Sequence, residues 1–224
     1  MKASNWILLV TASLILLIVI WWMMRGPNYT DDHALAAALS GDVQLLQEVL
    51  DARPSLLHAR SMSSGASLLH LAVRSGSLPA VNLLIDHGLN PQDRDDRGQA
   101  VIDLLDPASS GKSAEVFQRL LEVGAEFDPE RGGHLLLAAA YAGDLPLIEL
   151  LLQHGVPITY RDTHERGVMH AAAAAGHRDV MDFLRSRDAR LSDQQEDRYG
   201  ITPGVMFEEA VSVLSSSEAE EEEE

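Results

Sequence analysis

The sequence contains no cysteine, which excludes disulfide bonds and metal sites built from thiolates. This absence does not distinguish an oxidising compartment from a reducing one. Cations are also scarce, since 17 Lys and Arg residues stand against 34 Asp and Glu residues and the net charge is −17 at pH 7. Such an acidic chain repels phosphate backbones, so the composition argues against nucleic acid as a partner.

Only one long uncharged apolar run is present, and it lies at the N-terminus. Residues 6–24 form 19 consecutive uncharged positions, enough for a helix to cross a bilayer. Bulky residues follow the run instead of a small-residue cleavage site, so we expect residues 1–25 to be an uncleaved signal anchor. Secretion after cleavage is the alternative. Lys2 and the amino terminus outweigh Arg25 by one charge, which places the N-terminus in the cytoplasm and the rest of the chain outside, in the periplasm if the source is a Gram-negative bacterium.

Beyond the anchor, the clearest pattern is a pair of short helices. Apolar residues recur at helical spacing in 68–73 and again in 80–85. Ser67 precedes the first helix and can cap it, because its hydroxyl can accept a free N–H of the first turn. Gly76 separates the helices and Gly88 follows them, as expected where a left-handed residue ends a helix.

The same helix pair returns at a regular period. Its central glycines are separated by 35, 35, 32 and 33 residues, at Gly41, Gly76, Gly111, Gly143 and Gly176. A period near 33 with two helices per unit is typical of ankyrin repeats. The segment 67–70, Ser-Leu-Leu-His, stands where that family has T-P-L-H, and residues 199–203 repeat the family's G-x-T-P turn. Residues 30–214 therefore resemble the ankyrin repeat family.

The resemblance implies an all-α fold, an ankyrin-repeat solenoid of helix-turn-helix units, and the apolar run 6–24 predicts one N-terminal transmembrane helix before it. The expected segments are the anchor 1–25, a linker 26–29, units 30–60, 61–94, 95–128, 129–161 and 162–196, a partial unit 197–214, and an acidic disordered tail 215–224.

Two of these segments depart from the regular pattern. In the third unit, Asp106-Pro107 interrupts a helix that starts near Val101, because proline cannot continue a helix interior. The partial unit has a single helix, from Pro203 to about Leu214. The tail after it has six carboxylates in its last seven residues and should stay solvated, with capture of a basic partner as the alternative.

Two loops that resemble ligand sites fail on spacing. The run Gly111-Lys112-Ser113 looks like the end of a phosphate-binding loop, but Asp106 stands where such a loop needs glycine. Residues 93–98 resemble the start of a calcium loop, but Leu104 occupies the position of the required glutamate.

The nine histidines do not predict a zinc site. His70 and His170 lie three repeats apart, too far to share an ion, and the family resemblance implies that their imidazoles hydrogen-bond locally and link neighbouring turns. No serine stands in a catalytic motif such as G-x-S-x-G. We therefore expect no metal, no cofactor and no catalysis; an enzyme with an unrecognised site is the remaining alternative.

The resemblance implies that the concave face of the array binds a protein partner. Tyr141 and Arg74 are the expected energetic anchors, since tyrosine and arginine are enriched at binding hot spots. The acidic composition favours a partner with a basic surface. A self-assembling membrane scaffold is the alternative, and the oligomeric state stays open. Carried over by family position, the expected contact residues are Ser63, Ser64, Ala66, Arg74, Ser75, Asp96, Arg97, Gln99, Glu130, Arg131, Tyr141, Ala142, His164, Arg166, Ala174 and Ala175.

Overall fold

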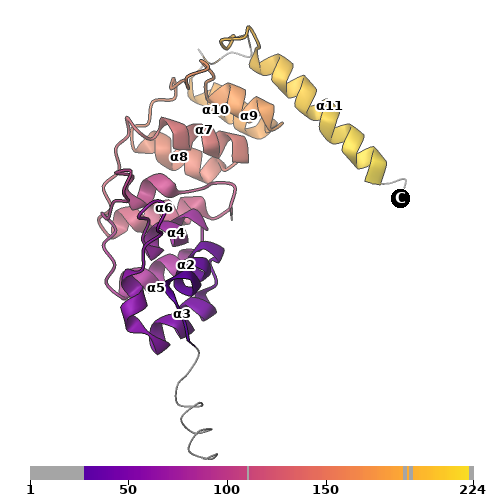
Figure 1. The fold of residues 1–224 in the computed structure, drawn as a ribbon. Coiled ribbons are helices and arrows are strands. Elements are labelled where there is room, and N and C mark those ends of the chain that lie inside the picture. The colour runs from indigo at the N-terminus through magenta and orange to yellow at the C-terminus, as the bar shows by residue number, and fades with distance from the viewer. Residues whose placement is uncertain (1–27, 110, 189–190, 192–193, 222–224) are drawn as a thin grey trace, which may run out of the picture.

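The protein is a stack of antiparallel helix pairs with a single long helix at its C-terminal end (Figure 1). The computed structural model describes residues 28–109, 111–188, 191 and 194–221, with side chains as far as residue 213. The predicted anchor lies outside these residues, as do residues 222–224 of the tail. In the part of the chain that is described, no helix is long and apolar enough to cross a membrane.

Two rows of helices run along the stack. The first helices of the units pack on one another, α2 (Asp31–Ser40) on α4 (Leu68–Arg74), α7 (Gly133–Ala142) on α9 (Val168–Ala174), and α9 on α11 (Pro203–Glu221). The second helices form the other row: α3 (Val43–Ala52), α5 (Leu78–Asp86), α6 (Ser113–Glu122), α8 (Leu145–Gln153) and α10 (Arg178–Arg187). We call the exposed surface of the first row, including α11, the inner face.

The glycines between paired helices adopt the left-handed conformation that the sequence pattern predicts. Gly41 has φ 68° and Gly143 has φ 74°, a region that residues with a side chain rarely adopt. Gly41 also allows close stacking, because a Cβ atom at that position would lie 2.7 Å from Cβ of Ser77 in the next unit. The turn therefore fixes the geometry within one unit and the distance to the next.

The core is a continuous layer of aliphatic side chains between the two rows. Each second helix contributes a leucine or phenylalanine with no exposed surface, and the first helices α2, α4, α7 and α9 contribute buried alanine or leucine. Leu151, in the C-terminal half of α8, is fully buried as predicted. Each unit thus buries its apolar residues against its neighbours, which is how repeat arrays gain stability. The fully buried residues of the second helices include Leu46, Leu84, Phe117, Leu120, Leu151 and Leu184.

The third unit differs from the others as the sequence predicts. Its first helix is reduced to the 3-10 turn η2 (Val101–Leu104), and Pro107 follows it closely. Its second helix, α6, buries Phe117 completely. The Phe117 ring meets the Phe127 ring edge-on at 5.0 Å and the His154 ring at 5.6 Å. The contact with His154 joins the third unit to the fourth, where the short η2 offers little packing surface, and the contact with Phe127 lies within the third unit.

The C-terminal helix extends further than predicted. Helix α11 runs from Pro203 to Glu221, so the backbone of residues 215–221 is helical where we expected a disordered tail. Alanine, glutamate and serine can continue a helix that is already nucleated. No paired second helix follows α11 among the described residues.

Candidate functional site

Three of the loops that connect successive units are each held by one aspartate. A carboxylate oxygen of Asp95, Asp162 or Asp197 accepts two backbone N–H bonds at 2.8–2.9 Å from residues two and four positions later. Burial opposes the charge on Asp162, but the bonds from Arg166 and from the His164 N–H outweigh it and lower the pKa of Asp162. The loops are therefore rigid supports for the side chains at their tips.

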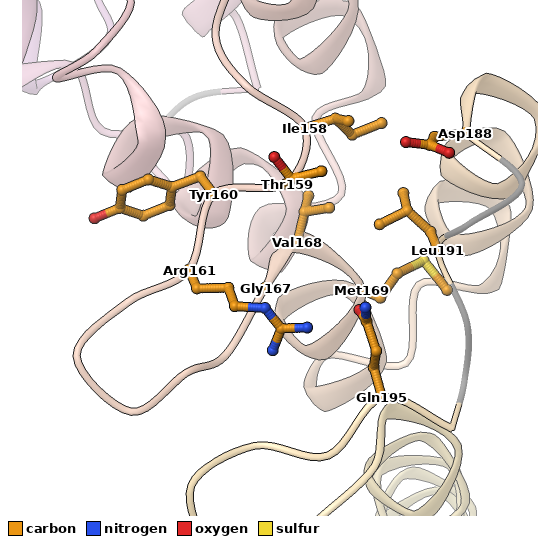
Figure 2. A pocket seen from close by; sticks show the side chains of 10 residues that line it. All are labelled: Ile158, Thr159, Tyr160, Arg161, Gly167, Val168, Met169, Asp188, Leu191 and Gln195. Carbon is orange, nitrogen blue, oxygen red and sulfur yellow. The ribbon is translucent and has the colours of Figure 1, made fainter.

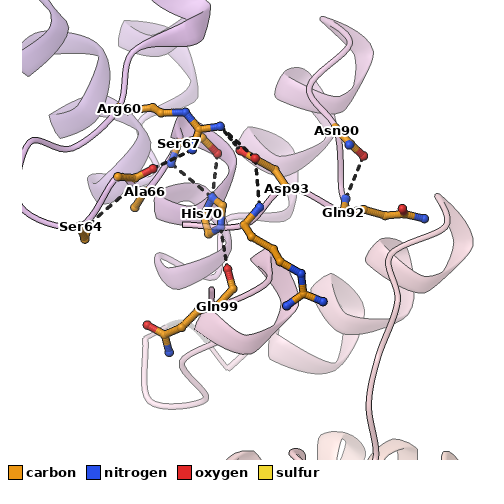
Figure 3. Close-up of polar contacts among 11 residues, drawn as sticks. Arg60, Ser64, Ala66, Ser67, His70, Asn90, Gln92, Asp93 and Gln99 are labelled. Carbon is orange, nitrogen blue, oxygen red and sulfur yellow. Dashed lines mark hydrogen bonds and ion pairs between the residues drawn. The ribbon is translucent and has the colours of Figure 1, made fainter. Parts of the chain in front are cut away.

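A histidine links the second unit to the third, as the family resemblance implied (Figure 3). Nδ1 of His70 lies 2.8 Å from Oγ of Ser67 and accepts the Ser67 N–H at 3.3 Å, while Nε2 lies 3.3 Å from the carbonyl of Gln99 in the next loop. Nearby, Arg60 at the end of the first unit forms an ion pair with the carboxylate of Asp93 in the second unit at 2.7 Å. In the fifth unit, Nδ1 of His170 accepts the Gly167 N–H at 3.2 Å.

We expect the protein to lose stability as the pH falls from about 7 towards about 5. Burial lowers the pKa of His70 and of His170 below 6.5 in the folded state. The unfolded chain then binds protons first, so the contribution of these histidines is complete above pH 6.5 and is lost as the pH falls through the lower, folded-state values. Urea unfolding at about pH 7.5 and about pH 5.5 measures the loss. NMR titration of the two imidazoles is the direct check, and pKa values at or above 6.5 would contradict this explanation.

Several of the predicted contact residues hold the loops together. The carbonyl of Ser64 accepts the N–H of Asp96 at 3.0 Å, which ties two neighbouring loops. Ala66 is buried. Arg131 forms an ion pair with Asp103 at 3.6 Å. These groups are engaged in contacts within the array, so they are poorer candidates for partner contacts than the sequence suggested.

Other predicted contact residues have positions suited to binding. Arg74 and Tyr141 are both exposed at the ends of first helices, and 58% of the Tyr141 surface is accessible. Ala174 is exposed at the equivalent place in the fifth unit. The loop-tip residues Ser63, Asp96, Arg97 and Glu130 are exposed as well, whereas Ser75, Gln99, Ala142, His164 and Ala175 are half-buried.

Sequence reasoning missed three exposed apolar side chains near these positions. Leu39 is 46% exposed and stands two residues before Gly41, the same place that Arg74 and Tyr141 occupy in their units. Met62 is fully exposed at a loop tip. Tyr199 is 67% exposed and its ring lies 6.0 Å from the ring of His164. The sequence pattern could have identified Leu39, because the residue two positions before each central glycine is one of the expected contact positions.

A groove on the inner face brings predicted residues together. Tyr141, Ala174 and Met206 line two adjoining hollows, of about 420 Å³ and about 560 Å³. Arg166 lies in the wall of the hollow of about 420 Å³. Its Nε and Nη2 atoms both donate to Oδ2 of Asp162, at 2.9 and 2.8 Å. We call this surface the inner groove. Its largest exposed side chain is Tyr141, one of the two anchors expected from the sequence.

A second cavity, of about 200 Å³, lies beside the fifth unit (Figure 2). Ile158, Val168 and Met169 form apolar parts of its wall, and Nη1 of Arg161 donates to the carbonyl of Glu165 at 2.6 Å. Among the residues that the structure describes, no group of three His, Cys, Asp or Glu side chains is placed to hold a metal ion. The inner groove therefore remains the better candidate site.

Comparisons with known proteins agree with this architecture. A family model described as "Ankyrin repeats (3 copies)" matches residues 104–195, and one described as "Ankyrin repeat" matches residues 64–96. The potassium channel AKT2/3 of Arabidopsis thaliana is 30% identical over 163 residues, which cover 73% of this chain and 20% of the channel. A putative ankyrin repeat protein of Rickettsia felis is 27% identical over 142 residues, or 62% of this chain and 36% of that protein.

Serine/threonine-protein kinase 12 of Arabidopsis thaliana is 36% identical over 86 residues, which cover 38% of this chain and 18% of the kinase. This chain thus spans a fifth or less of the length of the first relatives it matches. Both family models and the helix pairs describe this chain as a repeat array. The chain belongs to the ankyrin repeat family.

Proposed function

We propose that this protein is a membrane-anchored module that binds a partner protein through its inner face. The observation that carries the proposal is the exposure of Tyr141 above an apolar groove between α7, α9 and α11. A tyrosine supplies a large, rigid contact surface at low entropic cost, and exposed aromatic side chains beside a groove are typical of binding sites. Arg74 extends the same row of exposed first-helix ends towards the N-terminus.

Repeat arrays suit this role because their neighbouring units form one extended surface. The described residues use their apolar side chains chiefly for stacking, and the polar side chains of the loops hold backbone N–H groups. This arrangement supports a binding function without catalysis. The kinase activity in the name of one relative belongs to that protein, since the match covers 18% of its length.

Site-directed photocrosslinking tests the binding surface. A photoreactive phenylalanine analogue replaces Tyr141 in the full chain, in membranes of the native source, and Gln118 on the outer helix α6 is the exposed control position. We expect a discrete crosslinked product at position 141 and none at 118. In a separate pull-down with a chemical crosslinker, the double variant Tyr141→Ala and Arg74→Ala should no longer capture the same protein. Equal products at both positions would overturn the proposal. A product containing only this chain would support the self-assembling scaffold instead.

The anchor is proposed on the sequence alone, from the uncharged run 6–24. We expect the protein to stay in the membrane after carbonate washing, with its N-terminus inside and its repeats outside the cytoplasm. N-terminal sequencing of the mature protein checks this directly. A mature N-terminus near Gly26 would show a cleaved signal peptide, and the protein would then be secreted.

A further inference from the structure

The inner groove has a wall that the regular units do not provide. Helix α9 has 7 residues and α11, which packs on it, has 19. The longer helix therefore continues past the end of α9, and Figure 1 shows it projecting away from the stack. Met206, Glu209 and Val213 of α11 face Tyr141 and Ala174 across the hollow of about 560 Å³. This hollow lies between α11 and the C-terminal ends of α7 and α9, and we call it the wedge.

Two consecutive glutamates on α11 face different sides. Glu209 lines the wedge, whereas Glu208 lines a separate hollow of about 610 Å³ together with Arg178 and Phe207. Adjacent residues of a helix differ by about 100° in direction, which explains the division. Arg178 lies over the Phe207 ring at 4.5 Å. The hollow beside Glu208 is therefore lined by a cation, whereas no lysine or arginine among the described residues lines the wedge.

The charges around the inner groove are acidic. Arg166, its described cation, is bound through two contacts to Asp162. Asp106 is exposed at one end of the groove, and its carboxylate accepts the N–H of Ala108 at 3.0 Å. Glu209 is exposed at the other end. Within the described residues, neither Asp106 nor Glu209 forms an ion pair. The groove therefore has an apolar floor between two uncompensated carboxylates.

We propose that the inner groove binds a basic amphipathic segment of the partner protein. An apolar side chain of that segment packs on Tyr141, Ala174 and Met206, and flanking lysine or arginine side chains approach Asp106 and Glu209. Opposite charges at the rim direct association and select the partner, while the apolar contact at the centre supplies most of the affinity. This inference rests on the proposed function and adds the chemical class of the bound segment.

The test uses the full chain in nanodiscs of uncharged phosphatidylcholine and a fluorescein-labelled 12-residue peptide of leucine and lysine. Binding is measured by fluorescence anisotropy, with the signal of empty nanodiscs subtracted. The variant Glu209→Lys should weaken binding about tenfold, because it places a cation beside the cationic peptide. The matched control is Glu208→Lys, which makes the same charge change on the next residue and should weaken binding less than about twofold, through net charge alone. Tyr141→Ala should weaken binding by about tenfold or more.

Three outcomes overturn the proposal. The first is that wild type does not bind the leucine–lysine peptide above the empty nanodisc signal. The second is that Glu208→Lys and Glu209→Lys weaken binding equally, which means that the peptide senses only net charge. The third is that a peptide with glutamate in place of lysine binds as tightly. If one of these occurs while crosslinking at position 141 persists, the binding function stands and the basic segment is wrong; if the crosslink also fails, both proposals fail.

Discussion

Replacing Leu151 with alanine is expected to lower the free energy of unfolding by about 2–5 kcal/mol. Leu151 has no exposed surface and lies in the C-terminal half of α8, which packs on α7 and on α6 of the preceding unit. The substitution removes buried methyl groups from both contacts and leaves a cavity that rigid neighbours fill only in part. Urea unfolding monitored by circular dichroism measures the change.

The control for Leu151 lies on the same helix. Gln153 is exposed two residues later, and Gln153→Ala should change stability by no more than about 0.5 kcal/mol. A loss below about 1 kcal/mol for Leu151→Ala would mean that α8 presents a different side to the core than the structure shows, since only exposed positions give such small values.

Replacing Phe117 with alanine is expected to cost about 3–5 kcal/mol and to divide the array into two unfolding units. Phe117 is fully buried in α6, and its ring contacts the rings of Phe127 and His154. The contact with His154 crosses from the third unit to the fourth, where η2 has only 4 residues, and the contact with Phe127 holds the ring in place within the third unit. Losing them should let the N-terminal units open separately from the C-terminal ones. Native-state hydrogen exchange, read separately for α4 and α8, measures this.

Two further variants define the cause. Phe117→Leu keeps most of the volume but loses the ring contacts, so it should retain part of the stability and part of the cooperativity. Gln118→Ala, at the exposed neighbouring position, should change neither. If Phe117→Ala unfolds in one transition with equal exchange in α4 and α8, the aromatic cluster is not the coupling between the units.

Much of the fold could be predicted because its determinants are local. Glycines with positive φ, the interrupted third unit and the buried Leu151 all follow from positions within one unit or between adjacent units. The end of α11 was predicted too early, because alanine, glutamate and serine beyond Leu214 favour continuing a helix that is already formed even though the segment is acidic. The length of a terminal helix depends on helix propensity as well as on charge, and charge repulsion alone does not end a helix.

The candidate site was predictable only in part. Tyr141 and Arg74 are exposed where the repeat position placed them. Ser64 and Arg131 also lie at the predicted loops, but they hold other parts of the array. A position rule specifies where a residue stands along the chain, whereas its availability depends on which partner lies across the next loop. That partner is about one repeat away in sequence.

By itself, the sequence determined the family, the helix pairs, the irregular third unit and the roles of the buried histidines, because a 33-residue period repeats the same local chemistry. Only the tertiary structure explains the glycine at the start of α7. A Cβ atom at Gly133 would lie 2.2 Å from the ring of Tyr160 in the following loop. The tertiary structure alone also decided that Glu208 and Glu209 face different hollows. Both facts depend on how one element approaches another in space, and no period in the chain encodes that approach.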